Sequence, residues 1–203
     1  MFITFEGIDA CGKSTQLNLL KEYLLQNKFD VVTTREPGGT KLSEQIRDIL
    51  LDVNNDINPL SELLLFEAAR AHLVETIIKP ALDKNMIVLS DRFFDSTVAY
   101  QGYGRGLSLE QINYLNNLAI AGVVPTLTFY LCIPLEISLA RRNKKTVDRI
   151  EDIGDDFFQN VANGFSRIAE LEPERVVTID SSHSKEHTFN KIVTVVNEKL
   201  RRL

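Results

Sequence analysis

A glycine-rich loop near the start of the chain constrains the fold more than any other feature. An apolar run at residues 2–6 leads directly into the pattern G-x-x-x-x-G-K-S at residues 7–14. Glycines at both ends of this pattern allow backbone angles that a side chain would block, so successive N–H groups can turn toward phosphate oxygens. A helical pattern of leucines follows, and the amino end of a helix also favours an anion. The order strand, loop and helix therefore predicts a phosphate-binding loop.

Two side chains in the loop have predictable roles in binding a nucleotide. Lys13 supplies a positive charge that reaches β- and γ-phosphates, and the Ser14 hydroxyl can bind Mg²⁺. The residues expected to contact the phosphates of a bound nucleotide are Gly7, Ile8, Asp9, Ala10, Cys11, Gly12, Lys13, Ser14 and Thr15. The alternative is a chance match in a glycine-containing turn, and the flanking strand and helix patterns argue against it.

Composition limits the class of protein. The chain has 203 residues, of which 44% are hydrophobic and 25% charged, as in a soluble globular protein of one domain. A net charge of -5 argues against non-specific nucleic-acid binding as the main activity. The two cysteines, Cys11 and Cys132, lack the spacing of a metal or disulfide motif, which favours a reducing compartment. No apolar stretch is long enough to span a bilayer, so no membrane partner and a cytoplasmic location are expected.

Strand and helix patterns alternate along the chain. Apolar runs typical of strands occur at 2–6, 30–34, 86–90, 127–133 and 175–179. Helical patterns occur at about 13–27, 40–51, 59–84, 108–121, 134–142, 155–171 and 186–202. Continuously apolar strands separated by helices predict a mostly parallel sheet that is covered on both faces. In such sheets ligands bind beyond the carboxyl ends of the strands.

Polar residues gather where the predicted strands end. Asp91 and Arg92 directly follow the run at 86–90. An acidic residue in this place is the usual second anchor for nucleotide-bound Mg²⁺, although an aspartate also caps helices well. The Arg92 guanidinium could bind phosphate oxygens with two parallel hydrogen bonds. After the run at 30–34, Arg35 and Glu36 precede a Pro-Gly-Gly turn and would project into the same cleft, with Arg47 two helical turns further on.

Two other segments offer groups that could bind a nucleobase. Phe66 and Arg70 are four residues apart in a predicted helix and share a face, so a ring could stack on a base beside a guanidinium. A single helical phenylalanine is, however, more often part of the core. Residues 96–102 hold two hydroxyls, an aromatic ring and an amide, which could contact a base or sugar or could simply be a polar helix end.

A basic cluster occupies residues 141–151 of an otherwise acidic chain. Loop positions 8–11 carry no cation, so positive charge over a transferring phosphoryl group would have to come from elsewhere. This segment is a candidate lid, and the alternative is a solvated helix end whose lysines and arginines complement the helix dipole.

Together these motifs resemble those of bacterial thymidylate kinases over essentially the whole chain. The matching stretches are Phe5–Ser14, Thr34–Thr40, Phe66 with Arg70, Asp91–Phe93, Ser96–Gly102 and Asp148–Glu151. The phosphate loop alone is shared by many folds, whereas the Arg-Glu-Pro-Gly-Gly-Thr, Asp-Arg-Phe and Ala-Tyr-Gln-Gly stretches are much more specific.

The resemblance implies a fold and an activity. The expected fold is an α/β P-loop NTPase three-layer sandwich, with a five-stranded parallel sheet covered by helices on both faces and a short lid. The chain is expected to form one P-loop kinase domain, 1–203, with the lid at about 141–152. The implied reaction transfers the γ-phosphoryl group of ATP to dTMP, giving dTDP and ADP, with Mg²⁺ as cofactor. The resemblance also implies a homodimer.

The resemblance further implies roles for individual residues. Phe66 would stack on thymine, Arg70 would hydrogen-bond the base with Ser96, Thr97 and Gln101 nearby, and Tyr100 would lie against the deoxyribose. The dTMP phosphate would be held by Arg92, Arg47 and Arg35, with Glu36 also in the substrate site. Mg²⁺ would be bound by Ser14 and Asp91. The residues expected to act in catalysis are Lys13, Arg92, Arg149 and Asp9. Among the lid arginines Arg141, Arg142 and Arg149, the motif match favours Arg149.

Three positions depart from the pattern of the family. Ala10 replaces a common glycine, Cys11 occupies a small-residue position, and Phe165 stands where relatives often carry tyrosine. Because Cys11 lies at a helix start, its thiolate could be favoured and open to alkylation, or the residue could simply fit the space. Two other functions stay open at this point: another P-loop kinase of small nucleotides or nucleosides, and a slow nucleotide-dependent switch, although the chain has no Asn-Lys-x-Asp tetrapeptide.

Overall fold

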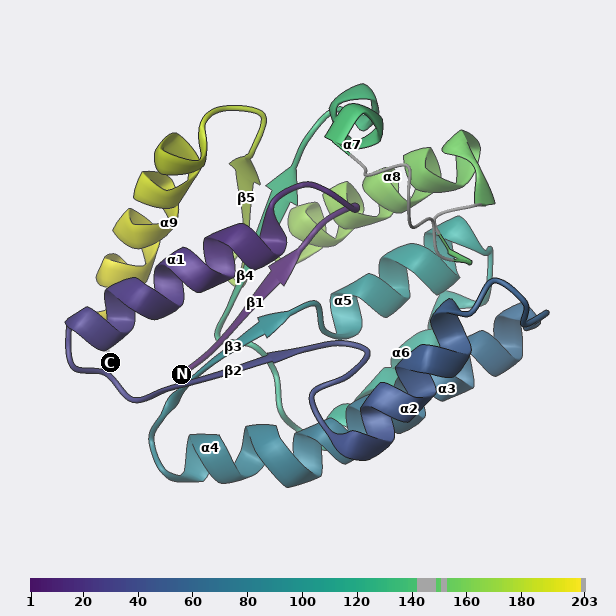
Figure 1. Cartoon of the computed structure of the whole chain (residues 1–203), viewed down its shortest axis with the longest axis horizontal. Coiled ribbons are helices and arrows are strands. Elements are labelled where there is room, and N and C mark those ends of the chain that lie inside the picture. Colours follow the sequence, from purple (N-terminus) through teal and green to yellow (C-terminus); the bar gives the residue numbers. More distant parts are fainter. Residues whose placement is uncertain (142–148, 151–152, 202–203) are drawn as a thin grey trace.

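A computed structural model describes residues 1–141, 149–150 and 153–201. Its centre is one sheet of five parallel strands in the order β2-β3-β1-β4-β5 (Figure 1). The strands are β1 (Phe2–Glu6), β2 (Val31–Arg35), β3 (Ile87–Asp91), β4 (Leu127–Cys132) and β5 (Val176–Asp180). Each lies within one residue of its predicted position, and the predicted five-stranded parallel sheet is confirmed.

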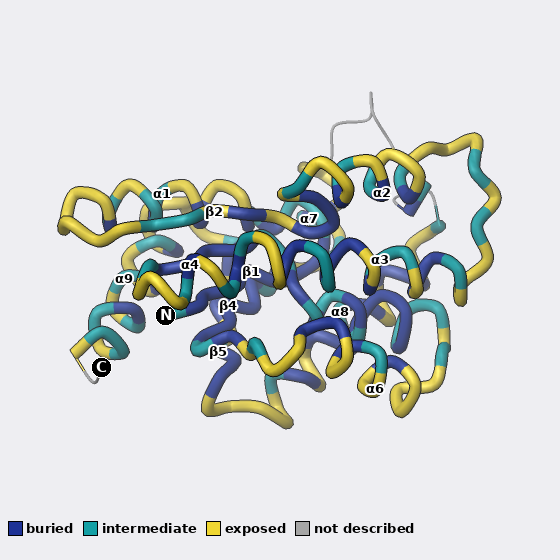
Figure 2. Tube along the Cα trace, turned by 90° about the horizontal axis from the view of Figure 1, so that it is seen from below, coloured by how far each residue is buried: buried dark blue, intermediate teal, exposed yellow. Residues whose placement is uncertain are grey.

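Helices cover both faces of this sheet. All five residues of β1 are buried, which requires cover on both sides because successive side chains point to opposite faces. Ile3 packs in one cluster with leucines of α1 (Lys13–Gln26) and with α9 (Lys185–Leu200). The neighbouring Phe2 packs in a second cluster with residues 73–81 and Phe93. Figure 2 shows the buried trace concentrated along the central strands, while the outward turns of the helices are exposed.

The remaining helices connect the strands along the chain. They are α2 (Lys41–Leu51), α3 (Pro59–Leu73), α4 (Lys79–Asp83), α5 (Phe94–Thr97), α6 (Leu109–Ile120), α7 (Leu135–Arg141) and α8 (Asp155–Leu171), with π-helical segments η1 (Val74–Ile78) and η2 (Val98–Gly104). Four helices begin where a side chain caps the first turn by accepting a backbone N–H hydrogen bond: Thr40, Asn58, Ser108 and Ser184.

The helical stretch from 94 to 104 is the element that the sequence does not predict. It carries no apolar repeat at helical spacing, and it contains Gly102 and Gly104. These glycines allow close packing: a Cβ at Gly102 would lie 2.5 Å from the Leu109 side chain, and one at Gly104 would lie 2.5 Å from the Phe157 ring. Tertiary packing against α6 and α8 therefore stabilises a helix that local propensity does not favour.

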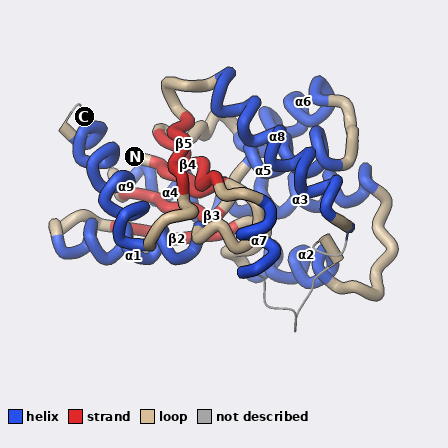
Figure 3. The backbone as a smooth tube through the Cα atoms, turned by 90° about the horizontal axis from the view of Figure 1, so that it is seen from above, coloured by secondary structure: helices blue, strands red, loops and turns tan. Residues whose placement is uncertain are grey.

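The carboxyl ends of the strands point toward one group of helices. In Figure 3, α2, α3, α6 and α8 gather beyond one end of the strands, on the side away from α9. Most of the predicted lid, at 142–148 and 151–152, lies outside the described residues. Within the part that the structure describes, no helix combines the length and the apolar character needed to cross a membrane.

Candidate active site

The phosphate loop adopts the backbone conformation that its glycines permit. Gly7 has φ +137°, and a Cβ there would lie 2.6 Å from the backbone oxygen of Leu131 on β4. Gly12 has φ +100° and directly precedes α1. Ala10 also lies in the left-handed region, at φ +58°, where a side chain costs roughly 1–2 kcal/mol. The family's glycine at this position would avoid that cost, yet the loop keeps its shape with alanine.

Lys13 lies over the loop rather than in bulk solvent. Its Nζ donates to the backbone oxygen of Ile8 at 2.9 Å and to that of Gly7 at 3.1 Å. The residue is only 7% exposed. A single ammonium is therefore held against the backbone of the loop.

Ser14 and Asp91 meet at the edge of the loop. The Ser14 hydroxyl donates to Asp91 Oδ2 at 2.5 Å, which brings together the first turn of α1 and the end of β3. Both are hard oxygen ligands of the kind that Mg²⁺ prefers, and Mg²⁺ usually takes only one or two protein oxygens beside phosphates and water. Among the described residues no cluster of three or more His, Cys, Asp or Glu forms a self-sufficient metal cage. The pair fits Mg²⁺ bound together with a nucleotide.

Arg92 connects the loop to the rest of the site. Its guanidinium donates to the backbone oxygen of Gly7 at 2.9 Å, to Ser96 Oγ at 3.1 Å and to Asp9 Oδ1 at 2.6 Å. It also donates to the Tyr100 hydroxyl at 3.1 Å. Arg92 itself has φ +72°, a backbone conformation that is uncommon for a residue with a side chain. Such outliers persist where the surroundings fix them, as they do here.

Glu6, at the end of β1, stabilises the segment that carries Arg92. Its carboxylate accepts the backbone N–H of Phe93 at 2.7 Å and the Ser96 hydroxyl at 2.6 Å. Burial raises the pKa of Glu6 to about 8, with a contribution from the charge of Asp95. Glu6 therefore links the end of β1 to the segment after β3 and fixes Phe93 and Ser96, which follow Arg92.

Two cavities lie side by side at this edge. The inner cavity is lined by Asp9, Glu36, Pro37, Arg47, Leu51, Phe66, Arg70, Arg92, Phe93, Ser96, Thr97, Tyr100, Gln101 and Ile150. The loop cavity is lined by Asp9, Ala10, Gly12, Lys13, Ser14, Thr15, Arg35, Glu36, Arg47, Asp91, Arg92 and Arg141. Four residues line both cavities: Asp9, Glu36, Arg47 and Arg92. The two spaces therefore share a boundary that contains two guanidinium groups.

The inner cavity unites nine of the ten residues expected to bind substrate. The exception is Arg35, which lines the loop cavity instead and pairs with Glu44 at 2.8 Å. Tyr100 is buried at the back of the inner cavity, with Phe165 packed edge-on against its ring at 6.2 Å. Phe165 also stacks on Tyr130 at 5.4 Å. The missing tyrosine hydroxyl at position 165 therefore leaves the packing behind Tyr100 intact.

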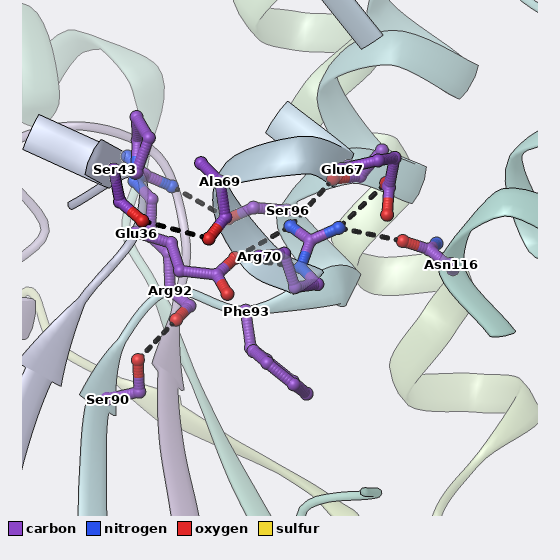
Figure 4. A network of polar contacts seen from close by, with 12 residues as sticks. Glu36, Ser43, Glu67, Ala69, Arg70, Ser90, Arg92, Phe93, Ser96 and Asn116 are labelled. Atoms are coloured by element: carbon purple, nitrogen blue, oxygen red, sulfur yellow. Dashed lines mark hydrogen bonds and ion pairs between the residues drawn. The ribbon is translucent and has the colours of Figure 1, made fainter. Parts of the chain in front are cut away.

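Arg70 is held by a buried network. Its guanidinium donates to Glu36 at 2.8 Å, Glu67 at 2.7 Å and Asn116 at 2.9 Å (Figure 4). It also donates to the Thr97 hydroxyl at 2.9 Å. Arg70 is 1% exposed. Burial raises the pKa of Glu36 to about 7, although the pairing with Arg70 opposes this shift. The donors of Arg70 are thus already engaged by protein oxygens, so any contact with a base would be made in addition to, or in exchange for, one of these bonds.

Comparisons with known proteins agree with this geometry. The family model described as thymidylate kinase matches residues 5–192. The chain is 48% identical to the thymidylate kinase of Prosthecochloris aestuarii, with 97% of this chain and 92% of the relative covered. It is 45% identical to that of a Thermoanaerobacter species, with 98% of each covered. The crystal structure of thymidylate kinase from Ehrlichia chaffeensis superposes with a TM-score of 0.79, at 40% identity over 97% of this chain and 98% of that one.

The chain belongs to the thymidylate kinase family. It is therefore a kinase, and the P-loop NTPase fold expected from the sequence is confirmed by the structural neighbour. The family explains why a phosphate loop, a basic boundary and an aromatic inner cavity occur together in one chain.

Two of the three candidate lid arginines, Arg141 and Arg149, are among the described residues, and their surroundings differ. Arg149 Nη2 pairs with Glu62 at 2.6 Å, and its Nε donates to the backbone oxygen of Leu50 at 2.9 Å. Arg149 is not among the residues that line the loop cavity, and its expected role as the cation over the phosphoryl group stays a prediction. Arg141 does line that cavity, and Arg142 lies outside the described residues.

Of the two interpretations of Cys11, the one in which its thiolate is favoured is wrong. The residue is fully buried, and burial raises the pKa of its thiol rather than favouring the thiolate. A Cβ at Gly7 would lie 2.9 Å from Cys11 Sγ, which shows that the sulfur fills space inside the loop. The alternative, a small residue that fits, accounts for Cys11.

Several residues of the site have no prediction from sequence. They are Glu62, Glu67, Arg105 and Asn116 around the inner cavity, and Ile150 in its wall. Glu62 carries a usable signal, because it precedes Phe66 by four residues and Arg70 by eight within an apolar helix. Arg105 and Asn116 carry no such signal in the sequence, because only the tertiary fold brings η2 and α6 beside α3.

Proposed function

We infer that the chain transfers the γ-phosphoryl group of ATP to dTMP, giving dTDP and ADP. The observation that carries this inference is the shared boundary of the two cavities. The phosphate loop lines one cavity, and aromatic and polar side chains line the other. Arg92 and Arg47 lie at the boundary between the two cavities. Phosphoryl transfer needs donor and acceptor phosphates aligned with their charge neutralised, and an ionised acceptor needs no strong general base.

The inner cavity suits a thymidine nucleotide. We propose that Phe66 stacks on the base, that Thr97, Ser96 and Gln101 contact its edge, and that Tyr100 lies against the sugar. Arg70 would hydrogen-bond the edge of the base, while the Glu36 and Glu67 carboxylates fix the plane of the Arg70 guanidinium. Asp9 lies beside Tyr100, 3.2 Å from its hydroxyl, and would approach the sugar or the metal-bound water.

The loop cavity suits the phosphates of ATP. We propose that the N–H groups of residues 7–15 and Lys13 bind the β- and γ-phosphates and that Arg92, Arg47 and Arg35 hold the phosphate of dTMP. Ser14 and Asp91 would hold Mg²⁺, which would neutralise charge on the phosphate oxygens. The loop itself offers one cation, so a further cation from outside it is expected.

Arg141 is the described lid residue that can supply this cation. We expect Arg141→Ala to lower kcat by about 10²-fold, because a cation at the transferring group stabilises charge in the transition state. Arg149→Ala is expected to lower kcat less than tenfold, roughly the effect of losing a positioning contact. Steady-state kinetics at saturating ATP and dTMP measure both. A larger kcat loss in Arg149→Ala than in Arg141→Ala would return the role to Arg149.

We further propose that the chain forms a homodimer through α3 and α6. These neighbouring helices expose Leu60, Leu64, Tyr114 and Leu118 at 54%, 48%, 70% and 69%. An exposed apolar patch of this kind marks an interface, and a second copy of the chain offers the same surface for a two-fold contact.

A charge introduced on this patch tests the dimer. Leu118→Lys is expected to convert the sedimenting species from dimer to monomer, because the lysine would be buried unpaired at the interface. Leu171→Lys on α8, exposed at 62%, is the matched control and should sediment like the wild type. A wild-type chain that sediments as a monomer at micromolar concentration would contradict the proposal.

The function is tested by ADP release from Mg-ATP with dTMP or thymidine as acceptor. Thymidine carries the same base and sugar but no phosphate for the basic boundary, so only dTMP should stimulate ADP release. The single-domain boundary, the lid and the cytoplasmic location stay predictions from the sequence.

A further inference from the structure

Glu62 is a buried carboxylate beside the inner cavity that does not itself line the cavity. It lies in the first turn of α3 and is 0% exposed. Its oxygens accept hydrogen bonds from Gln101 Nε2 at 3.0 Å, from Arg105 at 2.9 and 3.1 Å, and from Arg149 at 2.6 Å. Gln101 is the one of these three donors that lines the cavity.

This arrangement determines which way round the Gln101 amide lies. A carboxylate that is ionised can only accept hydrogen bonds, so the amide must present its NH₂ group to Glu62. Burial alone would raise the pKa of Glu62, but hydrogen bonds from Arg105, Gln101 and Arg149 lower it overall, so the carboxylate is ionised at neutral pH. The Gln101 Oε1 atom is thereby directed away from Glu62, and no side chain in the described part of the chain donates to it.

We propose that Glu62 is a positioning residue for nucleobase choice, which holds Gln101 with its amide oxygen available to the base. This inference rests on the proposed function, since it names how that site selects its base. The pairing edge of thymine carries two acceptors, O2 and O4, and one donor, N3–H. An acceptor fixed in the cavity wall complements N3–H. Cytosine has an acceptor at N3, so the same oxygen would face an unpaired acceptor and disfavour dCMP.

Arg105 and Arg149 explain why an ionised carboxylate is stable in this place. Burying one carboxylate without partners would be costly, and two guanidinium groups compensate its charge. Arg105 also lies over the Phe157 ring at 5.3 Å. The cations therefore keep Glu62 charged, and Glu62 in turn sets the polarity of Gln101.

The test replaces the carboxylate by a group that can donate as well as accept. In Glu62→Gln the Gln101 amide can lie either way round, and its NH₂ group can then face cytosine N3. We expect the ratio of kcat/KM for dCMP to kcat/KM for dTMP to rise about tenfold, the effect of one mismatched buried hydrogen bond. The ratio for dUMP to dTMP should stay within about threefold of wild type, because uracil carries the same N3–H as thymine.

Two further variants separate this role from a structural one. Arg105→Met removes one cation from Glu62 but leaves both the Arg149 pair, which keeps the carboxylate ionised, and the Gln101 bond. It should therefore lower the unfolding temperature without changing the dCMP ratio. Glu62→Asp keeps the charge opposite both arginines but withdraws the carboxylate from Gln101, and it should raise the dCMP ratio as Glu62→Gln does.

The outcomes are distinguishable. Equal losses for dTMP, dUMP and dCMP in Glu62→Gln and Glu62→Asp, with unchanged ratios, would overturn the proposal. Failure of both variants to fold would make Glu62 a residue of stability alone and would also overturn it. Failure of the proposed function would instead appear in the wild type, as an absence of ADP release that depends on dTMP.

Discussion

Arg92→Ala is expected to lower kcat/KM for dTMP by about 10²–10⁴-fold, or roughly 3–5 kcal/mol of transition-state stabilisation. The guanidinium is the group that joins the two cavities, with bonds to the loop at Gly7 and to Asp9, Ser96 and Tyr100. Alanine would remove both the charge that neutralises the acceptor phosphate and the contact that orients Asp9. Initial rates with varied dTMP at saturating Mg-ATP measure the effect.

Two variants control this experiment. Arg92→Lys keeps the charge but not the planar, two-pronged donor, and it should recover only part of the lost rate. Arg167→Ala removes an exposed arginine of α8 whose partner is Glu170, and it should leave the kinetics unchanged. Because Arg92 has φ +72°, alanine and lysine carry the same backbone strain, so thermal unfolding can separate lost stability from lost catalysis. Near wild-type rates in Arg92→Ala would remove the residue from the mechanism.

Lys13→Ala is expected to lower kcat by a similar factor, about 10²–10⁴-fold, because Lys13 is the only lysine or arginine within the phosphate loop. Its ammonium lies against the backbone oxygens of Ile8 and Gly7, at the place where β- and γ-phosphates would bind. Turnover at saturating concentrations of both substrates measures the loss in the transition state, and calorimetry with ADP measures the loss in binding.

Lys84→Ala is the matched control for charge. Lys84 is exposed and precedes β3, at the opposite edge of the sheet from the site, and its removal changes the net charge by the same amount. It should leave kcat unchanged. A Lys13→Ala variant that keeps turnover within tenfold of wild type would show that phosphate charge is neutralised by other groups.

The architecture could be predicted because its signals are local. Each strand is a short apolar run, and each lies within one residue of its predicted bounds. The helical segment at 94–104 could not be predicted, because it depends on glycines that allow close approach to α6 and α8. Its π-helical turn also places Tyr100 and Gln101 in the wall of the inner cavity, which no periodicity in the sequence indicates.

Site residues that belong to a sequence motif could be predicted. The ion pairs that they form in the folded protein could not. The loop, Asp91 and Arg92 follow from motif and position, whereas the role of Phe66 follows only from the family resemblance. The structure gathers these residues around two adjoining cavities. Arg149 matches a motif yet pairs with Glu62, because a buried carboxylate attracts the guanidinium groups within reach. Cys11 sits at a helix start yet has a raised pKa, because burial outweighs the helix dipole and the nearby Lys13.

Phosphoryl transfer to dTMP is tested by ADP release from Mg-ATP with dTMP, dUMP, dCMP, dGMP, AMP, UMP and thymidine as acceptors. We expect strong stimulation by dTMP and weaker stimulation by dUMP, since a single methyl group is worth about 1–3 kcal/mol of discrimination. The remaining acceptors should give little above the rate with ATP alone. Preference for another nucleotide would contradict the thymine site, and no stimulation by any acceptor would contradict phosphoryl transfer altogether.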